Sequence, residues 1–143
     1  MTTDKILLVD DEAEFVEALA KRMKARGMQV EVASDGQTAL DIAGSTNFTA
    51  IVLDLKMPGM DGIETLKRLK QINPDLQIIL LTGHGSIREG VDAIKLGAID
   101  FLEKPADFHE LMEKIEQAKA KKLLLVEKRT EEKLADILSK KAW

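Results

Sequence analysis

Ile6-Leu7-Leu8-Val9-Asp10-Asp11 is the stretch that decides the fold, because an unbroken apolar run ends there in two acidic residues. The same arrangement recurs in Ile51-Val52-Leu53-Asp54, in Ile78-Ile79-Leu80-Leu81-Thr82, and in Ile99-Asp100-Phe101-Leu102 followed by Lys104-Pro105. Short apolar runs are typical of strands buried on both faces, as in a parallel sheet covered by helices. Ligands of such sheets lie beyond the carboxyl ends of the strands, so we expect these polar side chains to converge at one edge.

Strand and helix signals alternate over the first 118 residues. Apolar residues recur at helical spacing after each apolar run, and residues 29–33 alternate like a further strand. Five β-α units of this length predict an α/β fold, a doubly wound five-stranded parallel sheet in the order 2-1-3-4-5. A closed barrel would need eight units and ~250 residues. Gly27 and Ser86 are expected to cap helices, and Asp35 and Asp61 to be turn or cap residues.

The segment after Asp107 contains neither Gly nor Pro, so the fifth helix is expected to be unusually long. Its first part carries apolar residues that suit packing on the sheet. Further along, a coiled-coil-like seam with steps of 3, 4, 4 and 3 is formed by Leu123, Val126, Thr130, Leu134 and Ile137. We therefore divide the chain into a domain over residues 1–120 and a helical extension over 121–143. A homodimer through this helix and a frayed tail are both open interpretations.

Composition excludes several classes of protein. At 143 residues and 45% hydrophobic content, the chain is long enough for one globular core. The net charge of −4 argues against direct nucleic-acid binding by the chain. Residues 119–143 have a net charge of +4, which we interpret as a solvated helix face rather than a nucleic-acid-binding tail. The chain has no cysteine for disulfides or thiolate metal sites. Since no apolar run approaches the ~20 residues of a membrane span, we expect a cytoplasmic protein.

The polar residues at the strand ends suit phosphoryl chemistry. Asp10, Asp11 and Asp54 would repel one another unless a cation lies among them, and Mg²⁺ prefers such oxygen ligands. Lys104 offers a positive charge and Thr82 a hydroxyl donor for phosphoryl oxygens. A carboxylate can also be the nucleophile that forms an aspartyl-phosphate, and Asp54 is the most central candidate. Taken singly, each residue is better explained as a cap, a turn residue or a solvated side chain.

In this combination the residues resemble the receiver domain of two-component response regulators. The resemblance covers about residues 4–120. It depends on four motifs: the run from Ile6 to Glu12; Asp54 with Met57-Pro58-Gly59-Met60-Asp61-Gly62; Leu81-Thr82-Gly83-His84-Gly85; and the run from Gly97 to Pro105. The sequences of these motifs are most similar to those in receivers of ATPase-type transcription activators. The resemblance implies a flavodoxin-like fold with an extended C-terminal helix.

The resemblance also implies roles for individual residues. Asp54 would accept a phosphoryl group from the phosphohistidine of a sensor histidine kinase. Asp11, Asp54 and the main-chain carbonyl of Lys56 would hold Mg²⁺, with Asp10 acting through a water molecule of the metal. Thr82 and Lys104 would bind the phosphoryl group.

The resemblance implies roles at three other positions as well. Phe101 matches the aromatic switch residue, although a plain core aromatic is the alternative. Lys56 and His84 occupy positions that tune the lifetime of the phosphate.

The leading hypothesis is a phosphorylation-controlled switch that acts on a downstream protein target or on self-association. It would catalyse only its own phosphotransfer and dephosphorylation, and would not be a turnover enzyme. A phosphorelay intermediate that passes the phosphate to a histidine-phosphotransfer protein is an alternative. A receiver fragment of a larger transcription regulator is another, and a constitutive interaction module with an idle phosphosite is a third.

Overall fold

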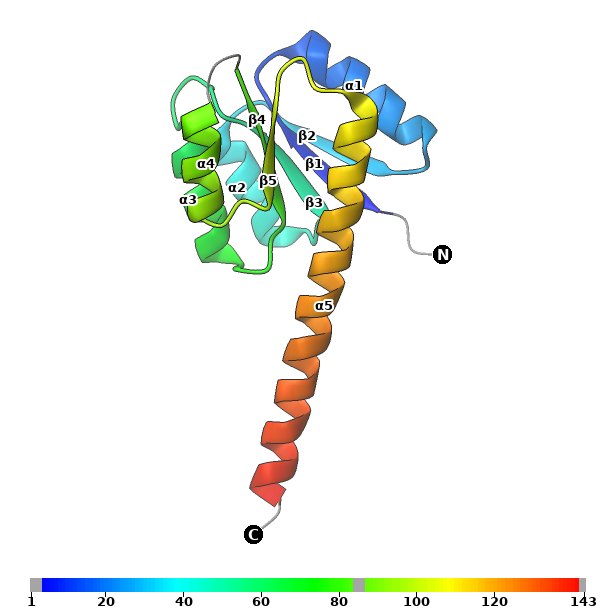
Figure 1. The fold of residues 1–143 in the computed structure, drawn as a ribbon, viewed down its shortest axis with the longest axis vertical. Helices are drawn as coiled ribbons and strands as arrows, with labels where there is room; N and C mark the ends of the chain where they lie inside the picture. The colour runs from blue at the N-terminus through cyan, green and yellow to red at the C-terminus, as the bar shows by residue number, and fades with distance from the viewer. Residues whose placement is uncertain (1–3, 84–86, 142–143) are drawn as a thin grey trace.

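The computed structural model describes residues 4–83 and 87–141, in which strands and helices alternate (Figure 1). The strands are β1 (Lys5–Val9), β2 (Gln29–Ala33), β3 (Ala50–Asp54), β4 (Ile78–Thr82) and β5 (Asp100–Glu103). The helices are α1 (Ala13–Ala25), α2 (Gly36–Ser45), α3 (Gly62–Ile72), α4 (Ile87–Lys95) and α5 (Phe108–Lys141). All strand pairs are parallel, in the order β2-β1-β3-β4-β5. The predicted fold class and strand order are confirmed.

The sheet separates two hydrophobic cores. Because side chains alternate along a strand, Leu7 and Val9 of β1 enter one core while Ile6 and Leu8 enter the other. The first core is closed by α2, α3 and α4, and the second by α1 and α5, so helices cover both faces (Figure 1). The central strands β3 and β4 are buried throughout, which explains why their sequences are continuously apolar.

Several helix ends follow the sequence signals. Asp35 and Asp61 cap α2 and α3, each with a carboxylate oxygen that accepts a backbone N–H at 2.8 Å. Gly27 follows the C-cap of α1 with φ of +89°, a conformation that glycine adopts without strain. Asn73 is the C-cap of α3. Ser86, the predicted cap of α4, lies outside the described residues.

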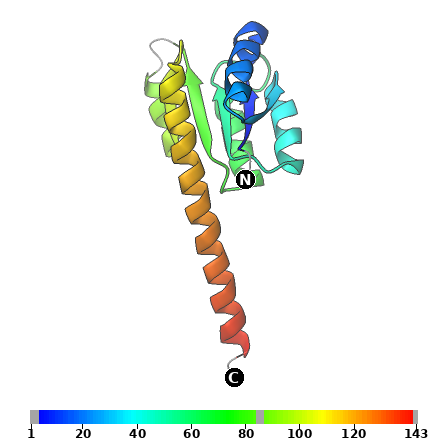
Figure 2. The same cartoon turned by 90° about the vertical axis from the view of Figure 1, so that its right-hand side faces the viewer.

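The helix α5 is continuous over 34 residues and projects well beyond the sheet (Figure 2). Its first part packs on the second core through Leu111, Ile115 and Ala118, which are fully buried. The predicted domain boundary at residue 120 falls inside this helix. No described helix is long and apolar enough to cross a membrane.

Two basic side chains connect the projecting part of α5 to the body. The Lys122 ammonium donates to the side chain of Asn47 and to the carbonyl of Phe48, which precede β3. About two turns further on, Arg129 Nε lies 2.8 Å from a carboxylate oxygen of Asp75, before β4. These contacts lie at the amino ends of the strands and orient the extension relative to the sheet.

Candidate functional site

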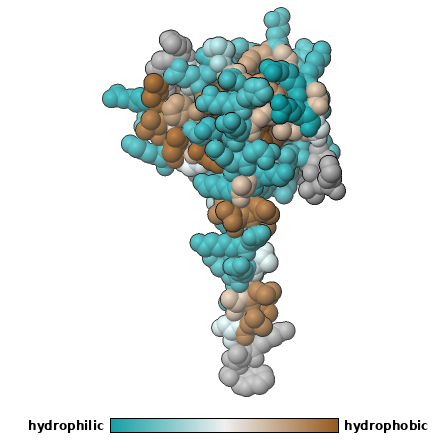
Figure 3. Space-filling view, turned by 45° about the vertical axis from the view of Figure 1, so that its right-hand side comes forward, coloured by the Kyte–Doolittle hydropathy of each residue, from teal (hydrophilic) through white to brown (hydrophobic). Residues whose placement is uncertain are grey.

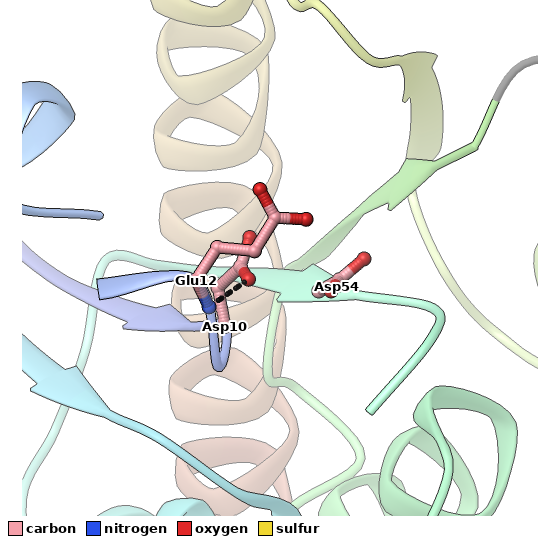
Figure 4. A group of neighbouring side chains, drawn as sticks. All are labelled: Asp10, Glu12 and Asp54. Carbon is pink, nitrogen blue, oxygen red and sulfur yellow. Dashed lines mark hydrogen bonds between the residues drawn. The ribbon is translucent and has the colours of Figure 1, made fainter. Parts of the chain in front are cut away.

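The carboxyl edge of the sheet brings together acidic groups from two neighbouring strands. Asp10 follows β1 directly and Asp54 is the last residue of β3, and these strands are adjacent in the sheet (Figure 4). Both residues are only 4% exposed, although each carries a carboxyl group. Burying two neighbouring carboxylates lowers the stability of the fold unless a cation lies beside them. The predicted convergence of polar strand ends is therefore present.

A third carboxylate belongs to Glu12, which the sequence interpretation missed. Oxygens of Asp10, Glu12 and Asp54 all lie within 4.8 Å of one another. The Glu12 N–H donates to Asp10 Oδ1 at 2.9 Å, and this short turn brings the two acidic side chains together (Figure 4). Asp11, between them, is exposed and is not part of this group. The signal was available as the acidic run Asp10-Asp11-Glu12, but the strand end alone does not tell which of the three point inward.

Lys104 occupies the centre of this acidic group. Its ammonium lies 2.7 Å from Asp10 Oδ2, 3.3 Å from Glu12 Oε1 and 3.5 Å from Asp54 Oδ2. It also lies 4.7 Å from the centre of the Phe15 ring, within range of a cation–π contact. Burial disfavours its charged form, but the hydrogen bond to Asp10 and the charges of Asp54 and Asp10 together raise the pKa of Lys104 above its ordinary value.

One lysine does not fully compensate the acidic group. Burial of Asp54 and the nearby charge of Asp10 raise the pKa of Asp54 to about 6, although Lys104 and the N–H of Lys56 oppose this change. The oxygen-only donor set suits a hard divalent cation, which would supply the missing positive charge. The residues present therefore fit Mg²⁺ in donor type and in charge. The assignment of Asp11 and of the Lys56 carbonyl as metal ligands stays a prediction.

Thr82 and Phe101 connect this edge with α4. Thr82 ends β4, is fully buried, and donates from its hydroxyl to the carbonyl of Leu102 at 3.4 Å. The half-buried Phe101 packs against Gly90 of α4, where an added Cβ would lie 2.5 Å from the ring. The hydroxyl therefore bonds to β5, the strand that carries the aromatic ring. His84, which the sequence interpretation connected with phosphate lifetime, lies outside the described residues.

Comparison with known proteins agrees with this geometry. The model of the response regulator receiver domain matches residues 6–116, and the chain belongs to this family. Receiver domains of response regulators are phosphorylated by histidine kinases and regulate downstream effectors. The resemblance inferred from the sequence motifs is thereby confirmed.

Individual relatives are moderately similar. The chain is 40% identical over 117 residues to the transcriptional regulatory protein FixJ of Bradyrhizobium diazoefficiens, covering 82% of this chain and 57% of FixJ. It is 37% identical over 122 residues to the transcriptional regulatory protein ZraR of Escherichia coli K12, covering 84% of this chain and 28% of ZraR. A receiver domain protein from Clostridium thermocellum superposes with a TM-score of 0.82 at 32% identity, covering 85% and 98% of the two chains. The chain thus spans only part of the length of these two transcriptional regulators.

Proposed function

We propose that Asp54 is phosphorylated by a sensor histidine kinase and that this phosphorylation switches a surface of the protein. The observation that carries the proposal is the buried carboxylate of Asp54 beside Asp10, Glu12 and Lys104 at the carboxyl edge of the sheet. Asp54 shares Lys104 with Asp10 and Glu12, so its charge is only partly compensated, and a buried carboxylate with a raised pKa is typical of a reactive site.

The proposed reaction uses the residues as follows. A carboxylate oxygen of Asp54 attacks the phosphorus of a phosphohistidine, so that a P–O bond forms while the P–N bond breaks and its electron pair returns to the imidazole. Lys104 moves from the carboxylates toward a phosphoryl oxygen, and the Thr82 hydroxyl exchanges its bond to Leu102 for another phosphoryl oxygen. Asp11, Asp54 and the main-chain carbonyl of Lys56 would hold Mg²⁺, with Asp10 acting through a water molecule of the metal. The bound ion would supply positive charge at the phosphoryl group. The protein would catalyse only its own phosphotransfer and dephosphorylation.

The proposed output involves the exposed apolar side chains of α4. Ile87, Val91 and Ile94 are large and apolar but each more than 40% exposed. Since the Phe101 ring fills the space above Gly90, a movement of Thr82 and Phe101 toward the phosphate would change the packing under α4. Such a change would bias the α4 surface toward a downstream protein target. We also propose a homodimer through α5, which does not require phosphorylation.

Phosphorylation is tested by mass spectrometry after incubation with acetyl phosphate and Mg²⁺. The wild-type chain is expected to gain one phosphoryl group, and the Asp54→Asn variant none, because its amide is not a nucleophile. The Asp61→Asn variant is the matched control, since Asp61 caps α3 through its side chain and is exposed. A wild type that stays unmodified, or an equal adduct on Asp54→Asn, would contradict the proposal.

A further inference from the structure

The projecting part of α5 carries an apolar face that the described residues leave largely exposed. Six side chains form this face, which we call the α5 stripe, and each is between 47% and 65% exposed: Leu123, Leu124, Val126, Leu134, Ile137 and Leu138. In the space-filling view, hydrophobic side chains appear on the projecting helix below the body (Figure 3). Large apolar side chains grouped in this way mark an interaction surface more often than scattered ones do.

The spacing of the α5 stripe suits a partner that is itself a helix. Leu123 and Leu134 are eleven residues apart, as are Val126 and Ile137. An 11-residue repeat has about 3.67 residues per turn, close to the α-helix itself, so the stripe runs along the helix with little winding. Between the two repeats, the Thr130 hydroxyl donates to the carbonyl of Val126 at 2.9 Å. Its polar group is thus satisfied within the helix and needs no partner in an apolar contact.

Most of the α5 stripe lies to one side of the contacts with the body. Lys122 and Arg129 make these contacts, and at 100° per residue Leu123 and Leu134 lie roughly 100° to 140° around the helix from them, whereas Val126 and Ile137 lie roughly 40° to 80° from them. Val126 lines a groove beside Asn47 and Asp75 of the body. A partner helix lying on the side of Leu123 and Leu134 would not meet the contacts that hold the extension to the sheet. Two chains related by a two-fold axis along the helices would have their bodies on opposite sides.

The two sides of the seam formed by Leu123, Val126, Leu134 and Ile137 carry opposite charges. By helical position, Glu127 and Glu131 flank this seam on one side, and Lys133 and Lys140 flank it on the other. In a parallel pair of identical helices, the acidic edge of one helix faces the basic edge of its partner, whereas an antiparallel pair brings like edges together. The charge pattern is therefore self-complementary in the parallel orientation.

We propose that the α5 stripe binds the α5 stripe of a second copy of this chain in a parallel helical pair. A second copy supplies an identical straight apolar surface with complementary edges, so the contact is isologous. The pairing begins at Leu123. Nearer the body, Glu113 and Glu116 lie on the same side of the helix, and pairing there would bring the acidic residues of the two copies together. This pairing does not depend on phosphorylation of Asp54 and is expected with the unphosphorylated chain.

Sedimentation equilibrium of the full chain over about 1 to 100 μM tests the pairing. Twice the chain mass of 15.8 kDa is expected for the wild type and for Asp54→Asn. The double variant Leu134→Lys with Ile137→Lys should weaken association by about 100-fold or more, because two desolvated positions become charged. The matched control, Glu132→Gln with Ser139→Lys, makes the same change in net charge on the opposite face and should leave the dimer intact. A monomeric wild type, or a dimer that persists in the double lysine variant, would overturn the proposal.

Orientation is tested with a single thiol, since the chain has no cysteine. The variant Ile137→Cys should form a disulfide-linked dimer in a glutathione buffer, because a parallel pair brings residue 137 next to its own copy. Ser139→Cys, on the opposite face, should not be linked. If Ile137→Cys stays reduced while the protein sediments as a dimer, the pair is not parallel and the proposed geometry fails. Circular dichroism of each variant shows that the helix is retained.

Discussion

Replacing Asp54 with asparagine is expected to raise the free energy of unfolding by about 1 to 3 kcal/mol at pH 7.5 in the absence of divalent cations. The pKa of Asp54 is raised to about 6 by burial and by the charge of Asp10, so the folded protein holds an ionised carboxylate that it disfavours. Asparagine has nearly the same shape, keeps an oxygen to accept the Lys56 N–H, and carries no charge. Lys104 retains its bonds to Asp10 and Glu12.

The gain should depend on pH in a defined direction. The folded-state pKa of Asp54 is above the ordinary value of 3.8. Ionisation of Asp54 therefore leaves the free energy of unfolding unchanged below about pH 4 and lowers it by the full amount above about pH 6. The difference in unfolding free energy between variant and wild type should therefore grow between these values and then level off. Urea unfolding monitored by circular dichroism at several pH values, with EDTA present, measures it.

The control is Asp11→Asn, because Asp11 is exposed and outside the group of close oxygens. Without a cation, this change should alter stability by less than about 0.5 kcal/mol. Mg²⁺ should stabilise the wild type by mass action and narrow its difference from Asp54→Asn. Two results would show that ionised Asp54 does not destabilise the fold. One is an Asp54→Asn variant no more stable than the wild type at pH 7.5, and the other is a gain in unfolding free energy that is as large at pH 4 as at pH 7.5.

Much of this site could be predicted because a parallel sheet obeys strong rules. The apolar runs before Asp10, Asp54 and Thr82 define buried strands, and all their carboxyl ends must lie at one edge. Even Lys104, which is 94 residues from Asp10 in the chain, could be expected there, because it follows the last strand. The caps at Asp35 and Asp61 are local and equally accessible to prediction.

Other features depend on side-chain geometry that the pattern of residues does not contain. The turn after β1 directs Glu12 rather than Asp11 toward Asp54, and three acidic residues in a row do not reveal this choice. The contacts of Lys122 and Arg129 with the loops before β3 and β4 require the angle at which α5 leaves the sheet. Helical spacing alone showed the apolar seam on α5 but not how it lies relative to these contacts.

Gly62 is a further residue whose importance only the structure reveals, and Gly62→Ala is expected to lower the free energy of unfolding by about 3 kcal/mol. A Cβ at this position would lie 2.6 Å from the Asp54 carbonyl oxygen and 2.6 Å from Leu55 Cα. Both are backbone atoms of the segment that carries Asp54, the proposed phosphoacceptor, so neither can move without displacing β3. The Gly62 N–H also donates to the Leu55 carbonyl at 2.9 Å, which holds the start of α3 against that segment.

Gly44→Ala is the matched control for this substitution. Gly44 lies in α2, and a Cβ there would have no atom within 4 Å, so alanine should stabilise the helix by about 0.5 to 1 kcal/mol. Thermal unfolding should therefore separate the two variants in opposite directions, with Gly62→Ala losing about 10 °C in Tm. If both alanines raise Tm, α3 tolerates a wider separation from β3 than the structure has. Close packing at Gly62 would then not position Asp54, and the rigidity of β3 would have to come from its pairing with β1 and β4 alone.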